Sequence, residues 1–204
     1  RVWPDGIWRK LHYAGQTKKF KVESIRPRNK EQILALELLL DPAVSMVTLT
    51  GMAGCGKTLL AIAAALHDRK SYDKIVITRP AESTSKEIGF LPGTKEEKMM
   101  PWLQPIMDNL KVLLGKHGQG YVNMMFEKGD IEVESLSYVR GRSFNNTFLI
   151  IDEAQNINQA EAKALLTRMG NNSKIVLLGD LEQIDSKRLN HRSSGLGQVV
   201  ERFK

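Results

Sequence analysis

The residues best suited to chemistry lie in one Gly-rich segment, residues 51–58, which reads Gly-Met-Ala-Gly-Cys-Gly-Lys-Thr. Its glycines let the backbone curl so that successive N–H groups point toward phosphate oxygens. Lys57 is expected to reach the β- and γ-phosphates of a nucleoside triphosphate, and the Thr58 hydroxyl is expected to bind Mg²⁺. A helix that begins at Lys57 adds the positive end of its dipole. The residues predicted to contact the nucleotide here are Gly51, Met52, Ala53, Gly54, Cys55, Gly56, Lys57, Thr58 and Leu59.

Two adjacent carboxylates form the second candidate cluster. Residues 148–151, Phe-Leu-Ile-Ile, predict a buried strand with Asp152 and Glu153 at its carboxyl end, where open α/β sheets place their ligands. Asp152 is expected to hold Mg²⁺ through its water shell. Glu153 is placed to polarise a water for attack on the γ-phosphate, as a catalytic general base. The pair therefore favours hydrolysis over phosphoryl transfer to a small acceptor.

Two further polar clusters also follow apolar strands. The amide of Gln183 is placed to contact both the γ-phosphate and the attacking water, so we interpret it as catalytic. Asp180 is expected to orient that amide or to help position Mg²⁺. At the end of the strand that follows the phosphate-loop helix, Thr78 and Arg79 are positioned to contact a nucleic-acid backbone. The alternative is a turn fixed by Pro80, with Arg79 in solvent.

The elements that position these clusters follow from hydrophobic runs and turn signals. The predicted strands are Met46–Thr50, Lys74–Thr78, Ile131–Ser135, Thr147–Ile151 and Lys174–Leu178. The predicted helices are Asn29–Leu40, with Asn29 as the N-cap, Lys57–Arg69, Lys95–Leu114, Gln159–Met169 and Gly197–Phe203. Apolar strands separated by helices imply a mostly parallel sheet covered on both faces. We therefore predict a three-layer α/β/α sandwich of the RecA-like P-loop type, with residues 95–145 inserted before the strand that carries the carboxylates.

Length and composition are those of one soluble α/β domain, with 204 residues, 42% hydrophobic and 26% charged. Residues 1–30 hold nine Lys and Arg side chains against two acids, which accounts for the whole net charge of +7. A basic leader predicts contact with polyanions such as RNA. Its aromatic residues Trp3, Trp8, Tyr13 and Phe20 are suited to stack on bases. The alternative is a solvated interdomain linker whose aromatic residues pack onto the core.

Several other classes of protein have little support in the sequence. No stretch approaches about eighteen consecutive apolar residues and no signal-peptide pattern opens the chain, so we expect no membrane partner. The single cysteine, Cys55, indicates a reducing, cytoplasmic setting. The four histidines are scattered without ligand spacing, which disfavours a metalloenzyme. The chain begins at Arg1 rather than Met, so we expect it to be a fragment of a longer protein.

With these motifs in place, the sequence resembles the PhoH-type ATPases from about residue 26 to its end. The resemblance rests on GMAGCGKT, ITRPAES, GFLPG…EKM…PW, VRGR…N…F, FLIIDEAQN and LLGDLEQID. The LPG and VRGR segments are the specific ones, because no general P-loop pattern contains them. PhoH proteins in turn resemble the first RecA-like domain of superfamily 1 helicases.

The resemblance implies an ATPase whose hydrolysis is coupled to binding or unwinding RNA or single-stranded nucleic acid. By likeness to the helicase Q motif, Gln32 would read the adenine edge, with Arg28 or Asn29 beside the base. Residues 25–32 are similar to the branch in which a PIN nuclease domain precedes the ATPase, so the full-length protein is expected to be an RNA helicase-nuclease. Accordingly, residues 1–25 are predicted to be a basic connector and residues 26–204 the ATPase domain.

Superfamily 1 enzymes complete their ATP site with arginines from a second RecA-like domain, and no such domain follows in this sequence. An arginine finger is worth roughly 10³–10⁵ in rate. We therefore expect it to come from a neighbouring subunit of a ring, which the family resemblance suggests is a homohexamer. Arg168 is the first candidate, followed by Arg142 and Arg188. Arg140 and Arg142 are also suited to bind phosphate, RNA or a neighbouring subunit.

Two alternatives to a nucleic-acid-coupled ATPase stay open. A small-molecule kinase shares the phosphate loop, but it needs an acceptor pocket and a lid with arginines and does not need Glu153 or Gln183. A nucleotide-dependent scaffold or switch uses binding without turnover to control a partner. If function survives Glu153→Gln while Lys57→Ala abolishes it, binding alone is sufficient.

Overall fold

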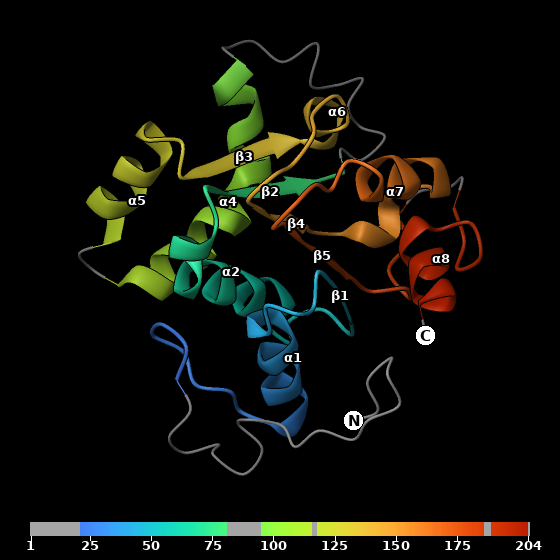
Figure 1. Ribbon diagram of the computed structural model, residues 1–204, viewed down its shortest axis with the longest axis horizontal. Helices are drawn as coiled ribbons and strands as arrows, with labels where there is room; N and C mark the ends of the chain where they lie inside the picture. The colour runs from blue at the N-terminus through green and yellow to red at the C-terminus, as the bar shows by residue number, and fades with distance from the viewer. Residues whose placement is uncertain (1–20, 81–94, 116–117, 186–188, 204) are drawn as a thin grey trace.

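The computed structural model describes residues 21–80, 95–115, 118–185 and 189–203. At its centre is a parallel five-stranded sheet in the order β1-β5-β4-β2-β3, with helices on both faces (Figure 1). The predicted three-layer α/β/α architecture is thereby confirmed.

The five strands lie where the hydrophobic runs predicted them. They are β1 (Met46–Thr50), β2 (Lys74–Arg79), β3 (Ile131–Ser135), β4 (Thr147–Ile151) and β5 (Lys174–Gly179). Only β2 and β5 differ from the prediction, each by one added residue at its carboxyl end. Every residue of β4 and β5 is buried, as expected for central strands of a sheet covered on both faces. Apolar and polar residues alternate in β3, which lies at the edge of the sheet.

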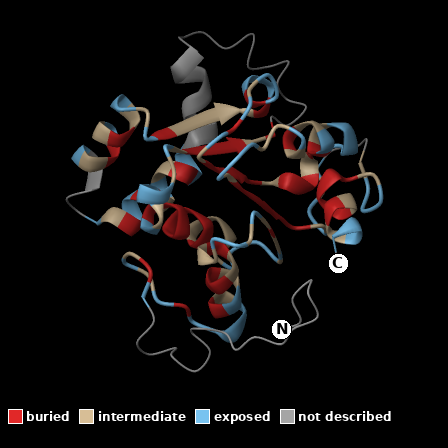
Figure 2. Ribbon diagram, in the orientation of Figure 1, coloured by how far each residue is buried: buried red, intermediate tan, exposed pale blue. Residues whose placement is uncertain are grey.

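The helices divide between the two faces of the sheet. They are α1 (Lys30–Leu40), α2 (Lys57–His67), α4 (Lys95–Leu114), α5 (Gly118–Glu127), α6 (Leu136–Val139), α7 (Gln159–Leu166) and α8 (Gly195–Arg202), with 3₁₀ turns η1 (Arg69–Ser71) and η2 (Ala154–Asn156). Because strand side chains alternate, Ile75 and Ile77 of β2 pack with α1, α2, α4 and α5, whereas Val76 packs with α6, α7 and α8. The buried residues line both faces of the sheet (Figure 2).

Two helices were not predicted, and three predicted helices have different ends. The buried residues of α5 and α6, such as Val122 and Val139, pack into the two core clusters, so these helices depend on tertiary packing. The helix predicted over residues 57–69 ends at His67, where the chain turns into η1. The helix predicted over residues 159–169 ends at Leu166. α8 begins two residues earlier than predicted, because the Ser194 side chain caps it.

The start and end of α1 are both fixed by side-chain hydrogen bonds. The predicted N-cap, Asn29, accepts a bond of 2.8 Å from the backbone N–H of Gln32. At the other end, the Lys174 ammonium donates to the carbonyls of Leu39, at 2.6 Å, and Asp41, at 2.8 Å. Lys174 is buried at the start of β5, and burial lowers its pKa to about 8, against the attraction of Asp68 and Asp41. This lysine therefore ties α1 to the sheet.

Most of the predicted basic connector, including its four aromatic residues, lies outside the described residues. In its described part, Val22 is buried in the core and the Ser24 hydroxyl donates to the Leu113 carbonyl at 2.7 Å. No helix in the described segments is long and apolar enough to cross a bilayer. Since the strands are parallel, all of them end along the same side of the sheet, its carboxyl-terminal edge. The residues that follow β1, β2, β4 and β5 meet there.

Candidate active site

The phosphate loop joins β1 to α2 at this edge. Gly54, at φ +76°, and Gly56, at φ +93°, adopt left-handed backbone conformations that residues with a side chain rarely adopt. The Lys57 ammonium folds over the loop and donates to the carbonyls of Gly51, at 2.5 Å, and Met52, at 2.9 Å. The exposed Cys55 thiol lies 3.8 Å from the same ammonium. The loop thus has the strand, turn and helix setting that phosphate binding needs.

Thr58 and Asp152 meet across this edge, although 94 positions separate them in the chain. The Thr58 hydroxyl donates to Asp152 Oδ1 at 3.0 Å. A hydroxyl beside a carboxylate is a donor set that suits Mg²⁺, which keeps several waters and takes its other ligands from phosphates. The described residues contain no group of three or more His, Cys, Asp or Glu side chains able to hold a metal ion. The Thr58–Asp152 pair fits a magnesium ion that takes its other ligands from water and from the phosphates of a nucleotide.

Asp152 is 7% exposed, and its surroundings shift its pKa. Burial raises the pKa of this carboxyl, and the neighbouring Glu153 charge raises it further. The hydrogen bond from Thr58 and the positive charge of Arg79 act in the opposite direction and do not cancel the rise. A divalent cation would favour the ionised form, so metal binding and deprotonation of Asp152 are coupled.

Glu153 occupies a strained backbone position with both carboxylate oxygens engaged. Its φ of +51° lies in the left-handed region, which is uncommon for a residue with a side chain. Arg79 Nη2 lies 3.4 Å from Oε1, and the Gln155 amide donates to Oε2 at 2.7 Å. The predicted general base is therefore oriented by two side chains.

Gln155 is the residue that joins the carboxylate cluster to the third motif. Its side chain is completely buried, and its Nε2 also donates to the Gln183 carbonyl at 3.0 Å. Its Oε1 accepts from the Asp180 backbone N–H at 3.2 Å. The Asp180 carbonyl in turn accepts from the Gln183 N–H at 3.0 Å. The ends of β4 and β5 are thus connected through one buried amide.

These motifs surround one pocket of about 360 Å³. The pocket lies against the phosphate loop and the carboxyl ends of β4 and β5. Its lining residues are Ala53, Gly54, Gly56, Lys57, Thr58, Leu59, Asn109, Asp152, Glu153, Gly179, Asp180 and Gln183. The loop, both carboxylates and the predicted catalytic amide therefore face a common space.

The remaining predicted nucleotide contacts lie around the loop without lining this pocket. Gly51 and Met52 contribute the carbonyls that hold Lys57, and the Met52 side chain is 78% exposed. Gln32 lies beside the loop, where its amide donates to the Cys55 carbonyl at 3.0 Å and accepts from the Arg28 N–H at 2.7 Å. The assignment of Gln32 to a Q motif and its contact with adenine both stay predictions.

Of the arginine candidates that the structure describes, none lines this pocket. The Arg168 carbonyl accepts from the N–H of Phe144, a residue just before β4, so Arg168 lies near the amino end of β4, opposite to the end that faces the pocket. Arg142 pairs with Glu132, at 2.7 and 3.3 Å, and Arg140 pairs with Glu161. Arg188 lies outside the described residues. Action of Arg168 on a neighbouring subunit stays a prediction.

Three features of the site were not predicted from the sequence. Gln155 was visible two residues after Glu153, but nothing local indicated that it reaches Gln183. Asn109 lines the pocket from α4, and no motif marks it. Arg79 was assigned only to nucleic acid or solvent, whereas it pairs with Glu153. Thr78 is wrong as a nucleic-acid contact, because it is completely buried.

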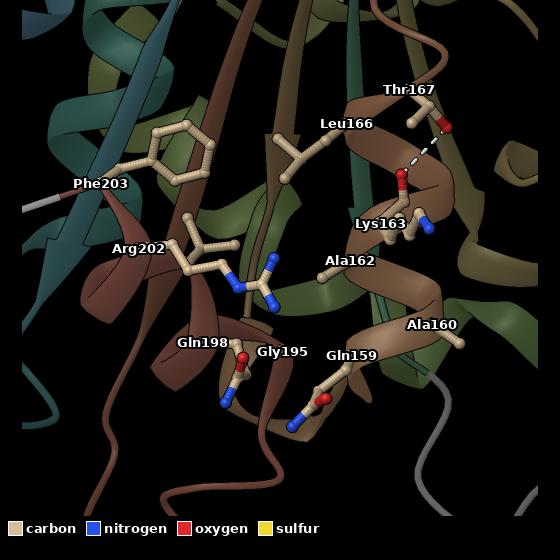
Figure 3. A pocket seen from close by; sticks show the side chains of 11 residues that line it. Gln159, Ala160, Ala162, Lys163, Leu166, Thr167, Gly195, Gln198, Arg202 and Phe203 are labelled. Atoms are coloured by element: carbon tan, nitrogen blue, oxygen red, sulfur yellow. Dashed lines mark hydrogen bonds between the residues drawn. The ribbon is translucent and has the colours of Figure 1, made fainter.

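A second pocket, of about 430 Å³, lies between α7 and α8 on the other side of the sheet (Figure 3). Leu166, Ala162 and Phe203 give it apolar walls, and Gln198 and Arg202 stand beside them. The described residues that line it include no Asp or Glu. It therefore has no carboxylate for acid–base or magnesium chemistry, and we assign the chemistry to the phosphate-loop pocket.

Comparison with known proteins agrees with this geometry. A sequence model of the family "PhoH-like protein" matches residues 24–204. The chain is 53% identical over 184 residues to Protein PhoH2 of Bacillus subtilis (strain 168). That alignment covers 88% of the chain and 42% of the relative. It is 37% identical over 182 residues to Protein PhoH of Escherichia coli (strain K12), in an alignment that covers 88% of the chain and 50% of the relative. The chain thus spans about half the length of these relatives or less.

A solved structure shares the fold. The UvsW helicase from bacteriophage T4 superposes with a TM-score of 0.58 at 16% sequence identity, covering 92% of this chain and 63% of that one. At this identity the likeness concerns the fold alone, and it confirms the predicted RecA-like arrangement of the sheet.

Proposed function

We propose, since the chain belongs to the PhoH-like protein family, that it binds ATP with Mg²⁺ and hydrolyses it to ADP and phosphate. Family membership and the helicase-like fold both suggest a nucleoside triphosphatase. The observation that carries the proposal is the pocket lined at once by Lys57, Thr58, Asp152, Glu153 and Gln183. A triphosphate in that pocket meets the phosphate loop on one side and the two carboxylates on the other.

The phosphate loop and Lys57 would bind the triphosphate. Backbone N–H groups of the loop and the N-terminus of α2 would hold the β- and γ-phosphates. Lys57 would exchange its two carbonyl contacts, with Gly51 and Met52, for phosphate oxygens. Mg²⁺, held by Thr58 and through water by Asp152, would supply neutralisation of the phosphate charge.

Hydrolysis would use Glu153 as the base. As the water oxygen forms a bond to the γ-phosphorus, Glu153 accepts the water proton, and the bond to the bridging oxygen breaks with release of ADP. Gln155 keeps the Glu153 carboxylate in place through its 2.7 Å hydrogen bond. Gln183, which follows the carboxyl end of the neighbouring strand β5, would contact the water and the γ-phosphate.

ATP hydrolysis is proposed to be coupled to the binding of a second ligand. We assign the coupled ligand to RNA or single-stranded nucleic acid, on the support of the helicase-like fold and of the nine Lys and Arg side chains in residues 1–30. The active form would be a homo-oligomeric ring, a hexamer by family likeness, in which Arg168 of one subunit reaches the next. A PIN nuclease domain and a cytoplasmic location are proposed for the longer protein.

The experiment that tests this function measures ATP turnover with and without single-stranded RNA, together with ATP-dependent separation of an RNA duplex. We expect turnover that requires Mg²⁺ and rises with RNA. Turnover without any effect of RNA would support ATP hydrolysis and contradict its coupling to RNA. Transfer of phosphate to a metabolite without net hydrolysis would support a kinase instead.

A further inference from the structure

The catalytic carboxylate of Glu153 is shared between two partners of unequal strength. A general base needs an oxygen lone pair that can accept a proton from water. Here Oε2 accepts a 2.7 Å hydrogen bond from Gln155, and Oε1 lies 3.4 Å from Arg79 Nη2. Each carboxylate oxygen has two lone pairs, so Arg79 does not block Oε1 but competes with the attacking water for it.

The two contacts differ in how easily they can be replaced. Gln155 is completely buried and is fixed by further bonds to Gln183 and Asp180. The contact with Arg79 is single and long, and the two side chains are 21% and 34% exposed. Such partly exposed pairs contribute little free energy, so another anion can displace Glu153 from Arg79.

The position of Arg79 makes it accessible from outside the nucleotide pocket. It is the last residue of β2, in register with Ser135 at the end of the edge strand β3. It is not among the residues that line the phosphate-loop pocket. A guanidinium binds phosphodiester oxygens through two parallel hydrogen bonds, which is better geometry than its present single contact with Glu153.

We propose that Arg79 is a switch residue that couples single-stranded nucleic acid to ATP hydrolysis. Its guanidinium binds Glu153 Oε1 until a phosphodiester group, at the carboxyl ends of β2 and β3, binds the guanidinium instead. The released oxygen then accepts the proton of the attacking water, while Gln155 keeps the carboxylate oriented. This inference rests on the proposed ATPase function and names how that site is regulated.

The test compares kcat and the KM for ATP in the wild type, Arg79→Gln and Arg79→Lys, each alone, with an oligouridine and with an oligothymidine of equal length. Without nucleic acid, Arg79→Gln should turn over about fivefold faster than the wild type, with a KM for ATP within about twofold. Neither oligonucleotide should stimulate it further. Arg79→Lys keeps a cation and should keep a slow basal rate and some stimulation.

A matched control removes an arginine from the other end of the sheet. Arg69, in η1 before β2, is exposed, and its side chain donates only to the Leu66 carbonyl, at 3.0 Å, among the described contacts. Arg69→Gln should show the wild-type basal rate and the wild-type stimulation. Loss of stimulation in both variants would indicate a general charge effect and would overturn the assignment to Arg79.

The remaining outcomes separate the switch from the function on which it rests. Stimulation by only one oligonucleotide, lost in Arg79→Gln, would support the switch and identify the strand as RNA or DNA. A lower rate with an unchanged stimulation ratio in Arg79→Gln would overturn the switch and leave Arg79 a structural partner of Glu153. Wild-type turnover without stimulation would contradict the switch alone, whereas absence of wild-type turnover would contradict the ATPase proposal.

Discussion

The buried amide of Gln155 donates a 2.7 Å hydrogen bond to the carboxylate of Glu153. The same amide also bonds to the backbone of Gln183 and Asp180, so the general base and the third motif share one support. Orientation of the base therefore depends on a residue that does not line the nucleotide pocket.

Replacing Gln155 tests this support. We predict that Gln155→Met lowers kcat about 10- to 100-fold, because misorientation of a general base forfeits most of its contribution. The KM for ATP should change less than about threefold, since the phosphate loop is untouched. Steady-state kinetics would measure both. Gln159→Met, at an exposed glutamine on α7, is the control and should retain wild-type kinetics; an unchanged kcat in Gln155→Met would rule out the positioning role.

The Thr58–Asp152 pair predicts a magnesium phenotype. Thr58→Val keeps the shape of the side chain but removes the hydroxyl that lies 3.0 Å from Asp152. We expect the Mg²⁺ concentration for half-maximal ATP turnover to rise at least about tenfold. Thr58→Ser restores a hydroxyl and should stay close to the wild type. Identical Mg²⁺ titrations for the valine variant and the wild type would argue against Thr58 as a ligand.

Gly179 is the position where added volume should disturb the site. A Cβ at this residue would lie 2.5 Å from Gln155 Oε1 and 2.6 Å from Leu196 Cδ2. Gly179→Ala should lower the free energy of unfolding by about 1–3 kcal/mol and reduce kcat, because the amide must move. Gly120→Ala in α5, where a Cβ meets nothing within 4 Å, is the control and should be neutral or stabilising. Denaturant titration would contradict the prediction if the two variants were equally stable.

Lys174 predicts how stability depends on pH. Its pKa is about 8 in the folded protein and close to the ordinary 10.5 in the unfolded chain, because burial disfavours the charge. Between these values the unfolded state binds more protons, so the free energy of unfolding should rise with pH. The slope is at most about 1.4 kcal/mol per pH unit. Below pH 8 both states are protonated, and this group adds no dependence.

The measurement is denaturant unfolding from pH 7 to pH 10 for the wild type and Lys174→Met. The variant lacks the titrating ammonium, so the difference between the two proteins should change with pH and level off below about pH 8. A constant difference across the range would show that Lys174 titrates alike in both states.

Much of the fold and of the phosphate site was predictable because the signals are local. Runs of apolar, β-branched residues identified β1, β2, β4 and β5, and an alternation of apolar and polar residues identified β3. The Gly-rich loop carries its own strand and helix context within a few residues. Asp152 and Glu153 were found for the same reason, because they directly follow such a strand.

Features that depend on tertiary packing were not predictable from one sequence. The contact of Gln155 with Gln183 joins residues 28 positions apart and exists only because β4 and β5 are neighbours in the sheet. The pair of Arg79 and Glu153 spans 74 positions, between β2 and the end of β4. Asn109 reaches the pocket because α4 packs beside α2. None of these relationships has a periodic or spaced signature along the chain.

The decisive measurement is ATP binding and ATP hydrolysis, in parallel, by the wild type, Glu153→Gln and Lys57→Ala. We expect Glu153→Gln to bind ATP within about threefold of the wild type and to hydrolyse it at least about 100-fold more slowly, because only the base is lost. Lys57→Ala should lose most of its ATP affinity. Hydrolysis by Glu153→Gln at the wild-type rate, or a wild type that binds ATP without hydrolysing it, would contradict the assignment of this pocket as a hydrolytic ATP site.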